Sequence, residues 1–341
     1  MGLKSYILKR SIYSLILLMF VLTLNFIIFE LMPGNPIEFL ASSGRLKPGQ
    51  PEEVMALWGL SDPLPVKYGK YVSNMLTGKF GISFLSQTPV AEELGGRLSN
   101  TMLLVGSSTV LAIVIGIFLG VIAAQRRGGI FDNVSVITSL TTYSLPSFWM
   151  GMMFLLVFSF TLRWFPSAGS VPAEWAMHWP DPLWQGVILG TQLAIPSLTE
   201  IVGRLYHVAL PLIVLTLFSY GGYLLITRAT MLETLTEDYI VTARAKGLSE
   251  RTVLYKHALK NASLPLITNV ALSFGFLLTG AIITEQVFTY PGLGQWIWLA
   301  IGFADYPVLQ AIFYIIALCV IIANFIADLL YGVIDPRIKY T

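Results

Sequence analysis

Residues 238–265 read DYIVTARAKGLSERTVLYKHALKNASLP, the most basic stretch of the chain, and a long apolar run lies on each side of it. Each run is long enough to cross a bilayer, for which a helix needs about 20 apolar residues. The chain of 341 residues is 55% hydrophobic and only 12% charged, whereas soluble domains carry about 25% charged residues. The sequence therefore predicts an all-α integral membrane protein with this basic segment at one membrane face.

Six apolar runs without charges qualify as membrane-spanning helices. They cover residues 11–29, 101–124, 134–162, 208–227, 264–283 and 308–327. Helices are expected because lipid cannot satisfy the hydrogen bonds of irregular backbone. Gly116 and Gly120, four residues apart in the second run, predict a close contact between two helices. Two further uncharged stretches, residues 182–199 and 286–304, contain Pro and Gly and are interpreted as partly buried loops or interfacial segments.

The placement of Lys and Arg predicts the orientation of these spans. With the N-terminus inside, 13 of the 21 Lys and Arg residues lie on short inside segments, and the densest group follows the fourth run. Basic residues gather on the cytoplasmic side of membrane proteins. We therefore expect six transmembrane helices with both termini inside. The first run is longer than the core of a signal peptide, so we expect it to remain as a helix.

The chain is expected to divide into three parts. Residues 1–31 hold the N-terminal tail and the first span, residues 32–98 form an external loop region, and residues 99–341 form a core of five helices. A connection as long as 32–98 is typically ordered or functional, and a short amphipathic helix is expected at residues 66–75. Four tryptophans between residues 163 and 206 are interpreted as anchors at the membrane interface, with stacking on sugars as the alternative.

The basic segment is expected to form a short helix, a sharp turn and a second helix. Residues 240–246 can be helical, and Gly247 stands where a helix commonly ends with a left-handed residue. Ser249 is a good N-cap for a second helix leading back to the membrane. Pro265 is expected to start the fifth span, since proline is tolerated near a helix beginning.

The surface of this element is expected to dock another protein. Small side chains at Ala243 and Ala245 would let a partner approach closely. The basic side chains that could meet an acidic rim on the partner are Arg244, Lys246, Arg251 and Lys256. A groove on a partner could grip such a knob and turn its own closing motion into helix movement. The alternative is a solvated loop that only reflects the basic character of the inside face.

Residues 239–265 closely resemble the EAA loop of ABC importer permeases, in particular the B-type subunit of the dipeptide, oligopeptide and nickel class. Gly247 matches the glycine of that motif, Ala243 its second alanine, and Leu259 the leucine twelve residues after the glycine. The glutamate, first alanine, isoleucine and proline of the general motif are replaced here by Val241, Thr242, His257 and Lys260.

Further segments along nearly the whole chain are similar to signatures of the same family. They read Leu31-Met-Pro-Gly-Asn-Pro, Gly59-Leu-Ser-Asp-Pro-Leu, Thr77-Gly-Lys-Phe-Gly-Ile-Ser, Arg97-Leu-Ser-Asn-Thr, Ser144-Leu-Pro-Ser-Phe, Tyr290-Pro-Gly-Leu-Gly, Asp305-Tyr-Pro and Asp335-Pro-Arg-Ile. The resemblance implies the ABC type I importer permease fold, with a cytoplasmic coupling helix in the EAA-type loop 229–264. It also implies a multi-pass protein of a prokaryotic cell (plasma or inner) membrane.

The resemblance implies partners as well. A second homologous permease would complete a heterodimeric pore, two ATP-binding cassette subunits would sit on the inside face, and an external substrate-binding protein would deliver the cargo. Docking into the ATPase is implied for Ala243, Arg244, Ala245, Lys246, Gly247, Leu248, Ser249 and Leu259. Candidate pore or gate residues are Glu285, Pro291, Gly292 and Gly294. The expected cargo is a di- or oligopeptide, with an oligosaccharide or a nickel chelate as alternatives.

The chain itself is not expected to be an enzyme or to bind a cofactor, a metal ion or nucleic acid. No Gly-x-x-x-x-Gly-Lys-Ser/Thr loop occurs, so ATP and Mg are expected on partner subunits. Its only cysteine, Cys319, excludes an internal disulfide. A self-sufficient channel or secondary transporter is the rival function, but none of the six runs has a mid-span charge of the kind ion relays use. A structural membrane scaffold is the third option, and the specific inside loop argues against it.

Overall fold

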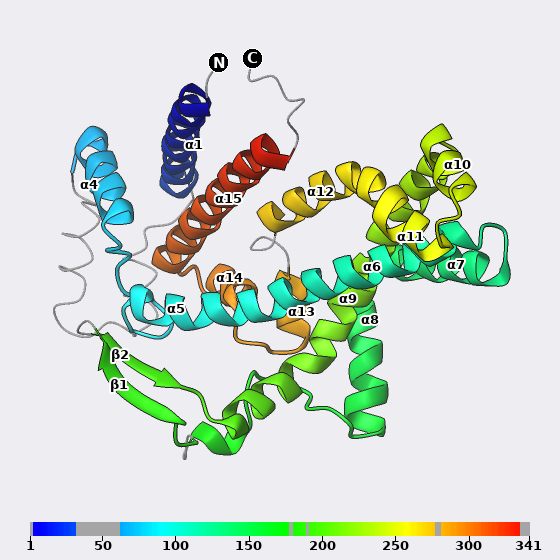
Figure 1. Ribbon diagram of the computed structural model, residues 1–341. Helices are drawn as coiled ribbons and strands as arrows, with labels where there is room; N and C mark the ends of the chain where they lie inside the picture. The colour runs from blue at the N-terminus through cyan, green and yellow to red at the C-terminus, as the bar shows by residue number, and fades with distance from the viewer. Residues whose placement is uncertain (1–2, 32–61, 177–179, 189–190, 277–280, 335–341) are drawn as a thin grey trace. The chain divides into compact units, whose positions relative to one another are not determined.

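The computed structural model describes residues 3–31, 62–176, 180–188, 191–276 and 281–334, most of them helical (Figure 1). Residues 32–61 of the expected external loop lie outside the described residues, as do the family-like segment that begins at Asp335 and most of the one that begins at Leu31. The chain divides into two compact units. The first comprises Met1–Thr101, Ala271–Ile282 and Gly292–Thr341, and the second comprises Met102–Val270 and Ile283–Pro291.

The first unit is built from α1 (Leu3–Leu31), α4 (Leu64–Leu76), α5 (Val90–Thr101), α14 (Leu293–Gly302) and α15 (Tyr306–Ile334). α1 packs against α15, and α14 packs against α5 and α15. The side-chain amide of Asn25 in α1 donates to the Tyr71 hydroxyl in α4 (2.8 Å) and to the Gln310 carbonyl in α15 (3.2 Å). α4 confirms the helix expected at residues 66–75. Pro65 lies in its first turn, where proline is tolerated because backbone N–H groups there have no acceptor within the helix.

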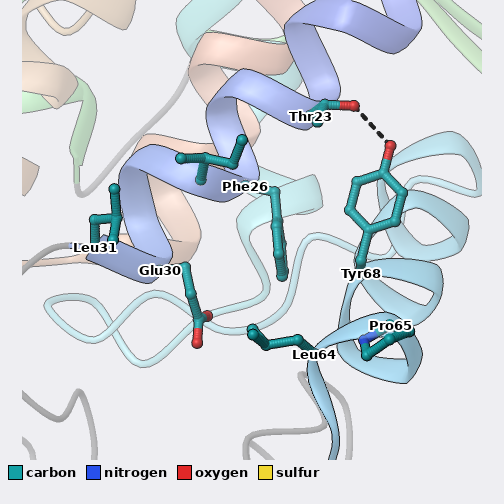
Figure 2. A pocket seen from close by; sticks show the side chains of 8 residues that line it. Thr23, Phe26, Glu30, Leu31, Leu64, Pro65 and Tyr68 are labelled. Carbon is teal, nitrogen blue, oxygen red and sulfur yellow. Dashed lines mark hydrogen bonds between the residues drawn. The ribbon is translucent and has the colours of Figure 1, made fainter.

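An open hollow of about 490 Å³ lies between α1 and α4, and Figure 2 shows its lining side chains. Two polar contacts hold the helices together beside it. The hydroxyls of Thr23 and Tyr68 share a hydrogen bond of 2.7 Å, and the Lys67 ammonium lies 2.6 Å from the Glu30 carboxylate. α4 is thereby fixed alongside the C-terminal end of α1.

The helix of the second predicted span begins earlier than expected. Helical structure runs from Val90 to Gln125, through α5, the π-helical turn η1 (Met102–Gly106) and α6 (Ser107–Gln125). The first eleven of these residues carry Glu93 and Arg97, which form an i,i+4 salt bridge at 3.1 Å. Because these side chains are charged, a search for apolar runs does not include this part of the helix. Pairs of opposite charge at i and i+4 nevertheless stabilise helices.

The second unit contains α6, α7 (Ile130–Ser144), α8 (Ser147–Phe154), η2 (Leu155–Thr161), η3 (Ala173–Ala176), α9 (Leu198–Thr234), α10 (Asp238–Ala245), α11 (Glu250–Thr252) and η4 (Val253–Ala258). It also takes in most of α12 (Leu259–Phe276) and of α13 (Ile282–Val287). α9 is the longest helix of the unit and packs along both α6 and α7.

The third predicted span is bent rather than straight. Its two helical parts, Ile130–Ser144 and Ser147–Thr161, meet at an angle of 99°. Pro146 separates them, and Leu145 before it is extended, with φ −77° and ψ 136°. Proline disfavours the helical conformation of the residue that precedes it, which accounts for the break at this point.

The count of six spans stays a prediction. Four helices in the described residues are long and apolar enough to cross a membrane, and the bent pair makes a fifth if it forms one span. The remaining expected run, residues 264–283, includes residues 277–280, which lie outside the described residues. The sequence predicts that Pro265 starts a helix, and this prediction is wrong, because Pro265 lies inside α12. The second helix of the basic segment therefore continues into this run.

The two uncharged stretches interpreted as loops contain regular structure. In the first stretch, β1 (Trp184–Ile188) pairs antiparallel with β2 (Thr191–Ile195), with Trp184 opposite Ile195. In the other stretch α14 begins at Leu293, directly after Gly292, and includes Gly294.

Candidate functional site

The basic segment between α9 and α12 folds as the sequence predicts, into a helix, a glycine turn and a second helix. α10 ends at Ala245, and Gly247 has φ +75°, a left-handed conformation that costs glycine no steric strain. The Gly247 amide donates to the Arg244 carbonyl (2.9 Å) and the Leu248 amide to the Ala243 carbonyl (3.4 Å). These two bonds form a Schellman motif, which satisfies the last carbonyls of α10.

The start of the second helix is capped in the predicted way. The Ser249 hydroxyl accepts a hydrogen bond from the Thr252 amide (3.4 Å). An ion pair closes the turn, with the Arg244 guanidinium 2.7 Å from the Glu250 carboxylate. The hydrogen bond from Arg244 lowers the pKa of the Glu250 carboxyl below its ordinary value. Arg244, expected to face an acidic partner, is therefore already engaged within the chain.

The inner face of this element is anchored in an apolar cluster. Ile240 and Ala243 of α10 are buried there, together with Val253 and Leu254 of the second helix. The cluster is completed by Val121 and Ala124 of α6, Met231 of α9, and Ala258 and Ala262. The inner face of α10 is thus fixed to the C-terminal parts of α6 and α9, and Figure 1 shows α10 beside α11.

The burial of Ala243 corrects the interpretation that it offers a small surface to a partner. Its side chain is 6% exposed and packs inside the cluster, and Leu259 is half-buried against the same cluster. Residues i and i+3 of a helix share a face, so Ala243 follows Ile240 inward. Ala245, Lys246 and Gly247 are exposed, as expected.

The outward surface of the element is more apolar than the sequence reading suggested. Tyr239, Val241 and Leu248 are 37%, 59% and 39% exposed. We call the basic segment, residues 238–265, the coupling element, and these three side chains, with Ala245 and Lys246, its outer face. Tyr239 and Val241 alternate with buried Ile240 and Ala243 along α10. Large apolar side chains exposed together are suited to protein contact.

The helices beneath the element are locked together at small residues. A β-carbon added at Gly116 would lie 2.6 Å from Tyr223 Cβ, and one added at Gly120 would lie 2.6 Å from Thr227 Cβ. Both positions are closer than carbon atoms approach, so only glycine permits this packing of α6 on α9. The close helix contact expected from these glycines is confirmed, and it is made within the chain.

An ion pair that sequence reasoning missed joins α7 to α9. The Arg228 guanidinium donates to both carboxylate oxygens of Asp132, with Nη2 at 2.7 Å from Oδ2, and the Gly128 amide donates to the same oxygen at 2.9 Å. The Asp132 side chain is 1% exposed. Gly221 of α9 packs nearby on α7, its missing β-carbon 2.8 Å from the Ser139 carbonyl oxygen. No local pattern marked Asp132, because its partner lies 96 residues along the chain.

The candidate pore residues fall into two groups. Glu285, which is fully buried, and Pro291 belong to the second unit, whereas Gly292 and Gly294 belong to the first. The Tyr290 amide donates to the Glu285 carbonyl (2.8 Å), and the Leu293 amide donates to the Thr101 hydroxyl (2.8 Å). The turn between α13 and α14 is therefore fixed at both of its ends. Within the described residues, no three His, Cys, Asp or Glu side chains are grouped so that they could hold a metal ion.

Comparison with known proteins covers almost the whole chain. Residues 116–340 match the family described as binding-protein-dependent transport system inner membrane component, and residues 3–105 match the N-terminal region of such components. An oligopeptide transport system permease protein, AppB of Bacillus subtilis, is 37% identical over 98% of this chain and 99% of its own. The dipeptide permease protein DppB of Escherichia coli is 38% identical over 93% of each chain. The glutathione permease protein GsiC of Salmonella choleraesuis is 36% identical over 98% of this chain and 99% of its own.

Proposed function

This chain belongs to the family of binding-protein-dependent transport system inner membrane components, and we propose that it forms half of the pore of a peptide importer. As a member, it is a multi-pass permease of the inner membrane and works with partner subunits. The proposal adds the partners: a second related permease, two ATP-binding subunits that hold ATP and Mg on the inside face, and an external protein that delivers the cargo.

The observation that carries the proposal is the coupling element on its helical base. The outer face of the element exposes Tyr239, Val241 and Leu248, while Ile240 and Ala243 hold its inner face on α6 and α9. α6 packs closely on α9 at Gly116 and Gly120, and the Asp132–Arg228 ion pair joins α9 to α7. A push on α10 would therefore move three helices together, since close-packed interiors transmit displacement rather than absorb it.

Peptide is the cargo that the similar proteins favour. The three relatives carry the names of oligopeptide, dipeptide and glutathione permeases, and all three cargoes are peptides. The alternative, an oligosaccharide, rested on the tryptophans. The Trp175 ring packs against α9, with Cη2 2.3 Å from the position that a β-carbon would take at Gly203, and the Trp296 ring lies under the Arg97 guanidinium at 4.8 Å. These two rings are used for packing within the chain, which weakens the argument for sugar stacking.

We also place Glu285 and the turn at Pro291, Gly292 and Gly294 beside the pore, as a candidate gate. Glu285 is a fully buried acid, and ionisable residues within membrane proteins are commonly functional. The Tyr290 amide is bonded within the second unit and the Leu293 amide within the first, so each side of the turn is fixed to its own unit.

The proposal is tested by purifying the tagged chain gently from its native membrane. We expect an ATP-binding subunit and a second permease to co-purify. Leu248→Asp places a charge on the apolar outer face, so it should release the ATP-binding subunit and leave the second permease bound. Asn261→Asp, at an exposed position of α12, is the matched control and should release neither. A chain that purifies alone, even after cross-linking, would overturn the proposal and favour a self-sufficient channel.

A further inference from the structure

A second hollow, of about 510 Å³, lies between α6 and the helix that follows the glycine turn. Its lining residues are Phe118, Gln125, Arg251, Leu254 and Tyr255, all within the second unit. We call it the α6–α11 hollow. It lies outside the outer face of the coupling element, so docking of an ATP-binding subunit on that face does not account for it.

The hollow lies along the last two turns of α6, from Phe118 to Gln125. Gln125 is the last residue of α6 and is followed by Arg126 and Arg127, the basic end of an apolar span. Phe118 stands seven residues earlier, which places it about 10 Å deeper along the helix. Its ring is 54% exposed on an apolar span, as a side chain facing lipid would be. One end of the hollow is therefore apolar, and the other is polar and interfacial.

The polar end of the hollow carries the Arg251 guanidinium. Among the residues that the structure describes, Arg251 forms no salt bridge. Glu250, which precedes Arg251 in the chain, is paired with Arg244. A negatively charged ligand is the chemistry that this end of the hollow fits, because an unpaired guanidinium binds a phosphate through two N–H donors.

We propose that the α6–α11 hollow binds one anionic phospholipid of the inner leaflet. The lipid phosphate sits on the Arg251 guanidinium, with the Gln125 amide and the Tyr255 hydroxyl beside the headgroup. An acyl chain follows Phe118 and Leu254 into the membrane. Basic pockets between transmembrane helices on the cytoplasmic side commonly bind such headgroups. The inference uses the inward orientation of the basic segment, and it does not depend on which ATP-binding subunit docks there.

The bound lipid would connect α6 to the coupling element through contacts outside the apolar cluster. Arg251 and Tyr255 lie on the second helix, directly after the Gly247 turn, and Gln125 ends α6. An occupied hollow would therefore restrain the second helix against α6. The transport activity of the chain would then depend on the anionic lipid content of the inner leaflet.

The test measures lipid bound to the intact purified chain, with whatever partners it retains, by native mass spectrometry. The chain is placed in nanodiscs of phosphatidylcholine with a minority of phosphatidylglycerol, and lipid retained after release is counted. We expect one retained phosphatidylglycerol, and about fivefold weaker retention in Arg251→Gln, since one basic side chain near the surface contributes about 1 kcal/mol. Lys260→Gln removes the same charge from an exposed position of α12 that does not line the hollow, and it should retain the lipid.

Two further arms separate this lipid from other occupants. Inorganic phosphate at millimolar concentration should not displace the lipid, because the acyl chain contributes to binding. A photo-reactive residue at position 255 should cross-link to lipid in the assembled complex. Equal retention by Arg251→Gln and Lys260→Gln, displacement by phosphate alone, or a cross-link to a protein subunit would each overturn the lipid site. None of these results bears on whether the outer face docks an ATP-binding subunit.

Discussion

The contact between α6 and α9 makes a sharp prediction for Gly120→Ala. The added β-carbon would lie 2.6 Å from Thr227 Cβ and 2.8 Å from the Leu224 carbonyl oxygen. A backbone oxygen cannot turn aside as a flexible side-chain end can, so the two helices must move apart. Gly222→Ala is the matched control, because it makes the same change on α9 at a position with no atom within 4 Å.

The expected size of the effect follows from that pairing. Both variants gain the same helix propensity, about 1 kcal/mol for alanine over glycine, so this gain cancels between them. What remains is the overpacking at Gly120, which typically costs about 1–3 kcal/mol. Gly120→Ala should therefore be less stable than Gly222→Ala by that amount.

Thermal unfolding of the purified chain in detergent, followed by the intrinsic fluorescence of its tryptophans, measures the difference. Gly120→Ala should unfold several degrees below Gly222→Ala, and Gly116→Ala should behave like Gly120→Ala because its β-carbon would lie 2.7 Å from the Tyr220 carbonyl oxygen. Equal unfolding temperatures for Gly120→Ala and Gly222→Ala would refute the reasoning that α6 and α9 are held in contact by missing side chains.

Three further predictions concern single residues. Asp132→Asn leaves the partly buried Arg228 without its counter-charge and should lower the free energy of unfolding by about 2–4 kcal/mol, measured by thermal or denaturant unfolding. The double variant with Arg228→Met should recover part of that loss. Full additivity of the two single variants would contradict a direct pair. Gly247→Ala should cost about 1 kcal/mol through its positive φ alone, since no atom lies within 4 Å, and Gly247→Asn should cost less; an equal loss in the two would point to a steric cause. Burial raises the pKa of the Asp305 carboxyl above its ordinary 3.8, so the folded chain binds this proton more tightly, and stability should rise as the pH falls through the raised pKa. Asp305→Asn should remove that part of the pH dependence of the unfolding temperature, and an unchanged pH profile would contradict it.

The sequence predicted the coupling element well because its signals are local. Gly247 after a short helix and Ser249 before the next one specify a Schellman end and an N-cap within a few residues, whatever the rest of the chain does. The amphipathic helix at residues 66–75 was predicted for the same reason. The close contact at Gly116 and Gly120 was predicted from a local pattern as well, since small residues four positions apart permit close helix contact.

What the sequence could not predict depends on long-range packing. The inward direction of Ala243 is set by the apolar cluster that α6 and α9 complete, and the Asp132–Arg228 pair joins residues far apart in the chain. The bend at Pro146 could have been predicted from the rule for residues before proline, but the apolar run around it concealed the break. The early start of the second helix was missed because Glu93 and Arg97 interrupt the apolar pattern.

The central claim is that the outer face of the coupling element docks an ATP-binding subunit. Site-specific photo-cross-linking in native membranes tests it most directly, with the reactive residue placed at exposed Leu248 and, as a control, at Ile137, which is exposed on α7. The account predicts a cross-link from position 248 to an ATP-binding subunit and none to that subunit from position 137. A chain that cross-links to no ATP-binding subunit from position 248, while transport remains active, would contradict it.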